Sequence, residues 1–252
     1  MEYVAILRAR RILTWYGGIL GAALLLMLYG VLTHHPTVQT DDRHAGVPMS
    51  ALIAGAAVAA ITIAAFLAAG FDAEYKTAAI AFTRPLSRMR IAQRFVLVAA
   101  VAMLAAFVAT LAAIFIVIAS LGAVKYITMD GGINVPLLFA AFGCAAMWYG
   151  LVVLVAAVFP GRGGAIVGLS WAYALIVPAF AHADLPVAFH ALFSALQYLD
   201  PLAYVGSVGS AHQGASPLGI ESVGVRAAIA WGIGAAALAS GVTLWAKREV
   251  PA

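Results

Sequence analysis

Charged residues are scarce in this 252-residue chain: Asp, Glu, Lys and Arg together make up 10% of it, whereas 65% of its residues are hydrophobic. Soluble globular domains are about 25% charged and about 45–50% apolar. So apolar a chain cannot cover a water-facing surface with polar groups, which excludes a soluble domain and a disordered or collagen-like polypeptide. The single cysteine, Cys144, excludes an internal disulfide bond. The composition indicates an integral membrane protein.

The motifs of several enzyme and cofactor classes are also missing. The chain has no GxxxxGK[S/T] phosphate loop, no HExxH zinc motif and no nucleophile–base arrangement. A b-type haem would need histidines that face each other within a helical bundle, but all six histidines lie outside the apolar runs. We therefore expect a protein that is not an enzyme and holds no cofactor. If it uses ATP, another chain binds it.

Six apolar runs are long enough to cross the roughly 30 Å hydrocarbon core of a bilayer as helices. Barrel strands would alternate polar and apolar residues, which these runs do not. The first run follows basic residues but is longer than the apolar region of a signal peptide and has no A-x-A cleavage site, so we expect it to be retained. The predicted fold is an all-α membrane protein, one domain over residues 1–252, with spans at 12–32, 51–71, 95–121, 135–159, 165–181 and 227–246.

Basic residues are distributed unevenly between the two sides of this predicted bundle. Three of them, Arg43, Lys125 and Arg226, fall on one side and eleven on the other. Because loops rich in Lys and Arg stay in the cytoplasm, we expect both termini to be cytoplasmic. The eleven are Arg8, Arg10, Arg11, Lys76, Arg84, Arg88, Arg90, Arg94, Arg162, Lys247 and Arg248.

Two segments on the basic side are predicted to be amphipathic helices. Residues 2–11 place Tyr3, Ile6 and Leu7 on one helical face, which fits a lead-in helix resting on the inner leaflet. The connection 72–94 has a helical pattern on both sides of Pro85, and proline favours a turn there. Such a surface helix suits either lipid headgroups or a docked protein. The helix–turn–helix outline favours docking.

The external connection 182–226 contains an apolar stretch, 186–199, that is too short to span a bilayer. The dipeptide Asp200-Pro201 interrupts it, and a second short apolar piece follows. We expect re-entrant helices packed against protein, with amphipathic helices lying on the membrane surface as the alternative.

The predicted spans contain no Asp, Glu, Lys, Arg or His. Ion pumps and many coupled transporters need ionisable groups at depth, so their absence disfavours those classes and suits an amphipathic or hydrophobic cargo. The external residues His34, His35, Asp41, Asp42 and His44 form the best metal-ligand candidate, but their spacing matches no zinc pattern, and we predict no metal site.

Glycines are frequent in the first and last spans, where they would permit close helix approach. The approach could be between two copies of the chain or within one. The glycines concerned are Gly17, Gly18, Gly21, Gly232, Gly234 and Gly241.

Residues 74–94 contain an acidic residue, Glu74, a short helical stretch 75–82, the sequence PLSR over 85–88, and Arg94 at the entry to the third span. With the six-span layout, this segment resembles the membrane subunit of type-2 ABC exporters, permeases that rely on a separate ATPase. In that family a Gly-Thr pair often follows the acidic residue. In this chain Lys-Thr follows Glu74, so only the threonine matches. A second similarity is the Pro-x-x-Tyr pattern of residues 201–204. The resemblance covers nearly the whole chain in layout.

The resemblance implies a function for each of these segments. Two permease subunits, identical or paralogous, would enclose a substrate path in the inner (plasma) membrane of a bacterium. Their partners would be an ABC ATPase that binds ATP and Mg²⁺, and membrane lipid, with no nucleic acid. Pro201 and Tyr204 would belong to an external gate. The ATPase-coupling residues would be Glu74, Tyr75, Phe82, Pro85, Ser87 and Arg88.

Two other functions stay open at this point. One is a channel or secondary carrier not driven by ATP, which the uncharged spans disfavour. The other is a membrane anchor or assembly subunit of an envelope complex.

Overall fold

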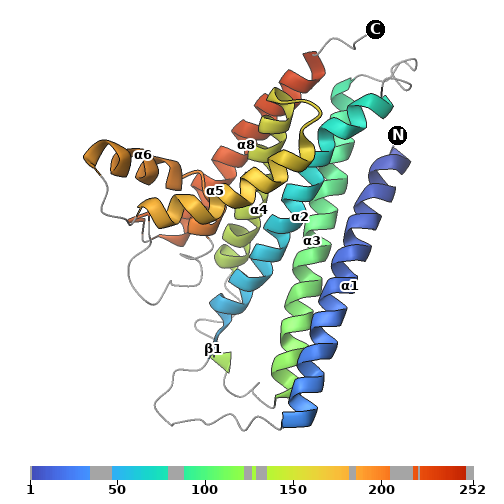
Figure 1. The fold of residues 1–252 in the computed structure, drawn as a ribbon, viewed down its shortest axis with the longest axis vertical. Coiled ribbons are helices and arrows are strands. Elements are labelled where there is room, and N and C mark those ends of the chain that lie inside the picture. The colour runs from blue at the N-terminus through green and yellow to red at the C-terminus, as the bar shows by residue number, and fades with distance from the viewer. Residues whose placement is uncertain are drawn as a thin grey trace.

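The chain is a bundle of long helices (Figure 1). The computed structural model describes residues 2–34, 47–78, 88–121, 127–128, 135–181, 186–204, 218–220 and 222–247. Two two-residue strands, β1 (Val47–Pro48) and β2 (Ile127–Thr128), pair in parallel with Val47 opposite Ile127. The helices are α1 (Glu2–His34), α2 (Met49–Ala78), α3 (Arg88–Ser120), α4 (Val135–Val158), α5 (Gly163–Ala181), α6 (Val187–Gln197) and α8 (Val223–Lys247).

The predicted multi-span helical character is confirmed. Among the described residues, the five helices α1, α2, α3, α4 and α8 are long and apolar enough to cross a membrane. The remaining predicted span, 165–181, falls within the 19-residue helix α5. The expected short helix after Pro186 is also present, as the 11-residue α6.

Three helices continue past the ends of their apolar runs. The predicted lead-in over residues 2–11 is helical, but it is continuous with the first span, because α1 is one helix of 33 residues. At 1.5 Å per residue it is about 50 Å long, well beyond the hydrocarbon core. No proline or glycine occurs between residues 2 and 16, so nothing in the sequence breaks the helix there. Likewise α2 runs on to Ala78, and α3 begins at Arg88.

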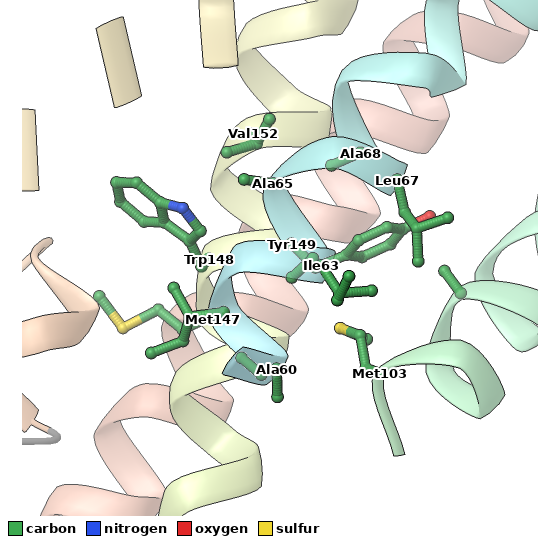
Figure 2. Packing of buried hydrophobic residues seen from close by; sticks show 14 of the residues in the cluster. Ala60, Ile63, Ala65, Leu67, Ala68, Met103, Met147, Trp148, Tyr149 and Val152 are labelled. Atoms are coloured by element: carbon green, nitrogen blue, oxygen red, sulfur yellow. The ribbon is translucent and has the colours of Figure 1, made fainter. Parts of the chain in front are cut away.

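The core is built around α2, which packs against α3 on one side and α4 on the other (Figure 2). Its buried face is made largely of alanines such as Ala56, Ala60 and Ala64, all fully buried. Small side chains let neighbouring helices approach closely. Figure 2 shows Ile63 of α2 near Met103 of α3, and Trp148 extending from α4 on the opposite side.

Helices α4 and α8 have the most extensive helix–helix contact, and glycines make it possible. A Cβ atom added to Gly234 would lie 2.8 Å from the Cα of Met147, and one added to Gly241 would lie 3.0 Å from the Cα of Leu154. These two glycines therefore serve packing within the chain. By contrast, a Cβ at Gly17, Gly18, Gly21 or Gly232 would have no atom within 4 Å in the described part of the chain.

Most of the basic residues lie at one end of the bundle, which we call the basic end. The start of α1, the end of α2, the start of α3, the turn between α4 and α5 and the end of α8 lie there together (Figure 1). The two strands lie toward the opposite end. The helix segments and the turn at this end contain Arg8, Arg10, Arg11, Lys76, Arg88, Arg90, Arg94, Arg162 and Lys247.

Candidate functional site

The predicted coupling residues fall on the two helix ends that the 72–94 connection joins. Glu74 and Tyr75 belong to the last turns of α2, so the expected helix after span two begins as its continuation. Arg88 is the first residue of α3. Phe82, Pro85 and Ser87 lie outside the described residues. Both helix ends are at the basic end (Figure 1).

A three-helix junction lies one turn before this segment. The guanidinium of Arg8 in α1 donates a hydrogen bond from Nη1 to the carbonyl oxygen of Gly70 in α2, at 2.6 Å. At the start of α5, a Cβ added to Gly163 would lie only 2.6 Å from the carbonyl oxygen of Ala69. Glycine is thus required for α5 to begin so close to α2. Residues 69–70 connect α1, α2 and α5 directly.

The predicted gate residues lie in a buried turn between α6 and α8. Residues 198–200 form a turn after α6, and residues 201–204 are helical, so the expected break at Asp200-Pro201 is confirmed. Pro201 and Tyr204 are both fully buried. The Tyr204 hydroxyl donates to the carbonyl of Tyr198 at 3.0 Å, and the Tyr173 hydroxyl of α5 donates to Leu196 at 2.6 Å. A gating role for this turn stays a prediction.

Asp200 is a buried acid that sequence reasoning treated only as a helix breaker. It is 0% exposed, and its Oδ1 accepts a hydrogen bond from the backbone N–H of Leu202 at 2.9 Å. Its Oδ2 has no partner within the described part of the chain. Burial raises the pKa of Asp200 to about 6, which the hydrogen bond from Leu202 partly offsets. The signal in the sequence was an Asp-Pro pair set between two apolar stretches.

A groove of about 410 Å³ lies between α4 and α5, and we call it the α4–α5 groove. Trp148 and Val155 line it from α4, Phe159 from the turn that follows, and Ile166 and Tyr173 from α5. Leu199, next to buried Asp200, also lines it. The groove therefore runs along the two helices from the basic end to the buried turn.

The turn between α4 and α5 places one cation on the groove. Gly161 has a φ of +77°, a backbone conformation that other residues adopt only with strain. It directs the chain from α4 into α5 and leaves the exposed Arg162 among the groove-lining residues. A second groove, of about 500 Å³, lies between α1 and α3 and is lined by Arg10.

Within the described ranges, no group of three or more His, Cys, Asp or Glu side chains could hold a metal ion. Of the histidine-rich candidate cluster, His35, Asp41, Asp42 and His44 lie outside those ranges. Comparisons with models of known families, with curated proteins and with solved structures gave no match. We therefore infer the function from the residues and their arrangement.

Proposed function

We propose that this chain is the transmembrane subunit of an ATP-driven exporter, which pairs with a second permease subunit and is driven by a separate ABC ATPase. The observation that carries the proposal is that most of the basic residues and both helix ends of the 72–94 connection share one end of the bundle (Figure 1). Cationic loops remain cytoplasmic, and the cytoplasm is where an ATPase finds ATP. The exporter type rests on the resemblance of residues 74–94 to type-2 permeases.

The arrangement of the helices supports six crossings with both termini cytoplasmic. Helices α4 and α8 both end at the basic end (Figure 1). Between the end of α4 and the start of α8, the chain must therefore cross from the basic end to the opposite end. Helix α8 then crosses back to the basic end. In this proposal α5, about 28 Å long at 1.5 Å per residue, makes the crossing away from the basic end. In this arrangement α6 and the 198–204 turn are the re-entrant, external segments.

The junction at residues 69–70 supports a route for coupling. An ATPase that docks on the end of α2 and pushes on it would also move α1, through the Arg8–Gly70 hydrogen bond, and α5, through the contact of Gly163 with Ala69. Rigid helices joined in this way move as a unit. ATP-driven closure of the ATPase pair would rock these helices and open the path outward.

A proton-coupled carrier is the second candidate, and Asp200 is the observation in its favour. It is the one buried acid among the described residues, and buried carboxyls with a raised pKa occur on proton pathways. Asp200 lies in the turn after α6, however, and the membrane-crossing windows of the five long helices lack such a group. A single acid outside the spans gives a proton no path across the membrane.

Affinity capture tests the ATPase partnership. The tagged chain is purified in mild detergent from membranes of its own organism, and we expect a protein with a phosphate-loop ATPase sequence to co-purify. Glu74→Ala combined with Phe82→Asp should abolish this capture while the chain stays inserted and oligomeric. Glu249→Ala, a charge loss at the C-terminus, is the matched control and should leave capture unchanged. Absence of any ATPase, with gradient-driven flux in vesicles of the chain alone, would overturn the proposal.

A further inference from the structure

We propose that the α4–α5 groove binds an anionic amphiphile, with its charged head at Arg162 and its apolar chain directed toward Trp148. This inference deepens the proposed function, because it names a class of cargo. The ligand proposal is tested by binding to the chain alone. Ligand binding can therefore fail while the ATPase partnership holds, and the ATPase partnership can fail while ligand binding holds.

The size and lining of the groove fit an apolar chain. Its volume of about 410 Å³ lies within the range of small-molecule sites, about 300–1,000 Å³. Val155, Phe159, Ile166 and Leu169 form its walls. A hydrocarbon chain would gain burial there without leaving any polar group of the walls unsatisfied.

The positive charge of Arg162, at the basic end of the α4–α5 groove, favours a ligand with a negatively charged head group. Arg162 is the one charged side chain among the described residues that line the groove, and it lies at the basic end next to the Gly161 turn. Among the described residues, no acidic side chain lines the groove to compensate for it. A carboxylate, phosphate or sulfate at the end of an apolar chain would supply the missing charge.

Trp148, at the end of the groove away from Arg162, has a buried hydrogen-bond donor. The indole of Trp148 is 4% exposed, and its Nε1–H has no acceptor within the described part of the chain. The neighbouring Tyr173, with ring centroids 6.3 Å apart, already donates its hydroxyl to Leu196. Buried N–H groups without an acceptor are rare. A hydroxyl on the ligand chain would accept this hydrogen bond once the indole turns its Nε1–H toward the groove.

The distance between donor and cation sets the length of the ligand. Ten residues of α4 separate Trp148 from its last residue, Val158, which is about 15 Å along the axis. Arg162 follows after the turn. A medium-length acyl chain with a carboxylate at one end and a hydroxyl at the other spans this distance.

The α1–α3 groove provides a matched comparison within the same molecule. It is of similar volume, is also apolar, and is lined by Arg10. Its one lining hydroxyl, that of Thr14, already donates to the carbonyl of Arg10 at 2.8 Å. It therefore has a cation but no unused buried donor among its described lining residues.

Binding is measured with the full chain in phosphatidylcholine nanodiscs at pH 8 by native mass spectrometry. The probes are dodecanoate, ω-hydroxydodecanoate and dodecyltrimethylammonium. We expect one site that binds ω-hydroxydodecanoate (the hydroxy acid) more tightly than dodecanoate (the plain acid). It should bind the cationic probe, dodecyltrimethylammonium, most weakly. Arg162→Gln should weaken both acids about fivefold, the size expected for an exposed charge contact. Arg10→Gln should leave them unchanged.

Two further variants distinguish the contribution of the Trp148 hydrogen bond from that of the apolar walls of the α4–α5 groove. Trp148→Phe should weaken the hydroxy acid about fivefold and leave the plain acid unchanged, since only a neutral hydrogen bond is lost. Val155→Trp should fill the α4–α5 groove and abolish binding of both acids, whereas Val101→Trp in the α1–α3 groove should not.

Equal binding of the cationic probe, or equal effects of Arg162→Gln and Arg10→Gln, would overturn the proposal, because either result would mean that the groove takes up bilayer lipid without selection. Binding of both acids by the Val155→Trp variant would also overturn the proposal.

Discussion

The guanidinium of Arg8 donates a hydrogen bond to the carbonyl oxygen of Gly70 at 2.6 Å, across 62 residues of sequence. This contact joins the first turns of α1 to α2 just before the predicted coupling residue Glu74. A charged side chain that bonds a backbone carbonyl of a neighbouring helix fixes the two helices relative to each other. Arg8 is thus a candidate for transmitting movement between them.

Replacing Arg8 by Gln is expected to loosen this junction. A hydrogen bond from a charged donor contributes about 1.5–3 kcal/mol when it is well buried, and Arg8 is only half-buried, so we expect a loss of roughly 1 kcal/mol. The apparent melting temperature in detergent should fall by a few degrees. Arg11→Gln, an exposed arginine of the same helix, is the control. Equal melting temperatures for both variants would show that the contact of Arg8 with Gly70 does not stabilise the fold.

The glycines of α8 should respond differently to the same substitution. Gly234→Ala places a methyl group 2.8 Å from the Met147 backbone, so α4 and α8 must move apart, and we expect the apparent melting temperature to fall by about 5 °C or more. Gly232→Ala, two residues earlier, meets no atom within 4 Å and should leave stability unchanged or raise it through helix propensity. Similar losses in both variants would contradict the packing described for Gly234.

Asp200 predicts the pH dependence of stability. Burial raises its pKa from 3.8 to about 6, so the folded chain binds this proton more tightly than the unfolded chain does. The stabilisation is therefore fully present below about pH 4 and is lost as the pH rises through about 6. We expect Asp200→Asn to remove that decline and to melt about 5 °C above the wild type at pH 7.5.

Asp200→Ala is the comparison variant for this measurement. It removes the same charge, but it also leaves the Leu202 N–H without its acceptor, which costs about 1 kcal/mol. It should therefore melt below Asp200→Asn at neutral pH. Identical pH profiles for the wild type and Asp200→Asn would show that the carboxyl titrates as if it were exposed.

The helical, multi-span character was predictable because it depends on composition and on the length of apolar runs, which lipid translates directly into helices. The ends of the helices were not. Segments with charged residues, such as 2–11 and 72–78, contain no proline and continue the helix beyond the apolar run, so the apolar run does not show where the helix ends.

The site was less predictable than the spans. Sequence alone could not tell Gly234, which packs against α4, from Gly232, which faces open space, because the difference depends on the rotation of α8. The burial of Asp200 and the α4–α5 groove depend in the same way on how α5 and α6 lie against α4. Such placements come from tertiary packing, which has no local sequence signal.

The central claim is that the basic end faces the cytoplasm and presents the 72–94 connection to an ATPase. Its most direct test replaces the buried Cys144 by Ala, introduces Ile80→Cys as the only cysteine, and labels the chain with a membrane-impermeant maleimide. We predict labelling in inverted membrane vesicles, none in right-side-out vesicles, and protection when the ATPase is bound. Labelling of residue 80 only from the periplasmic face would contradict the account.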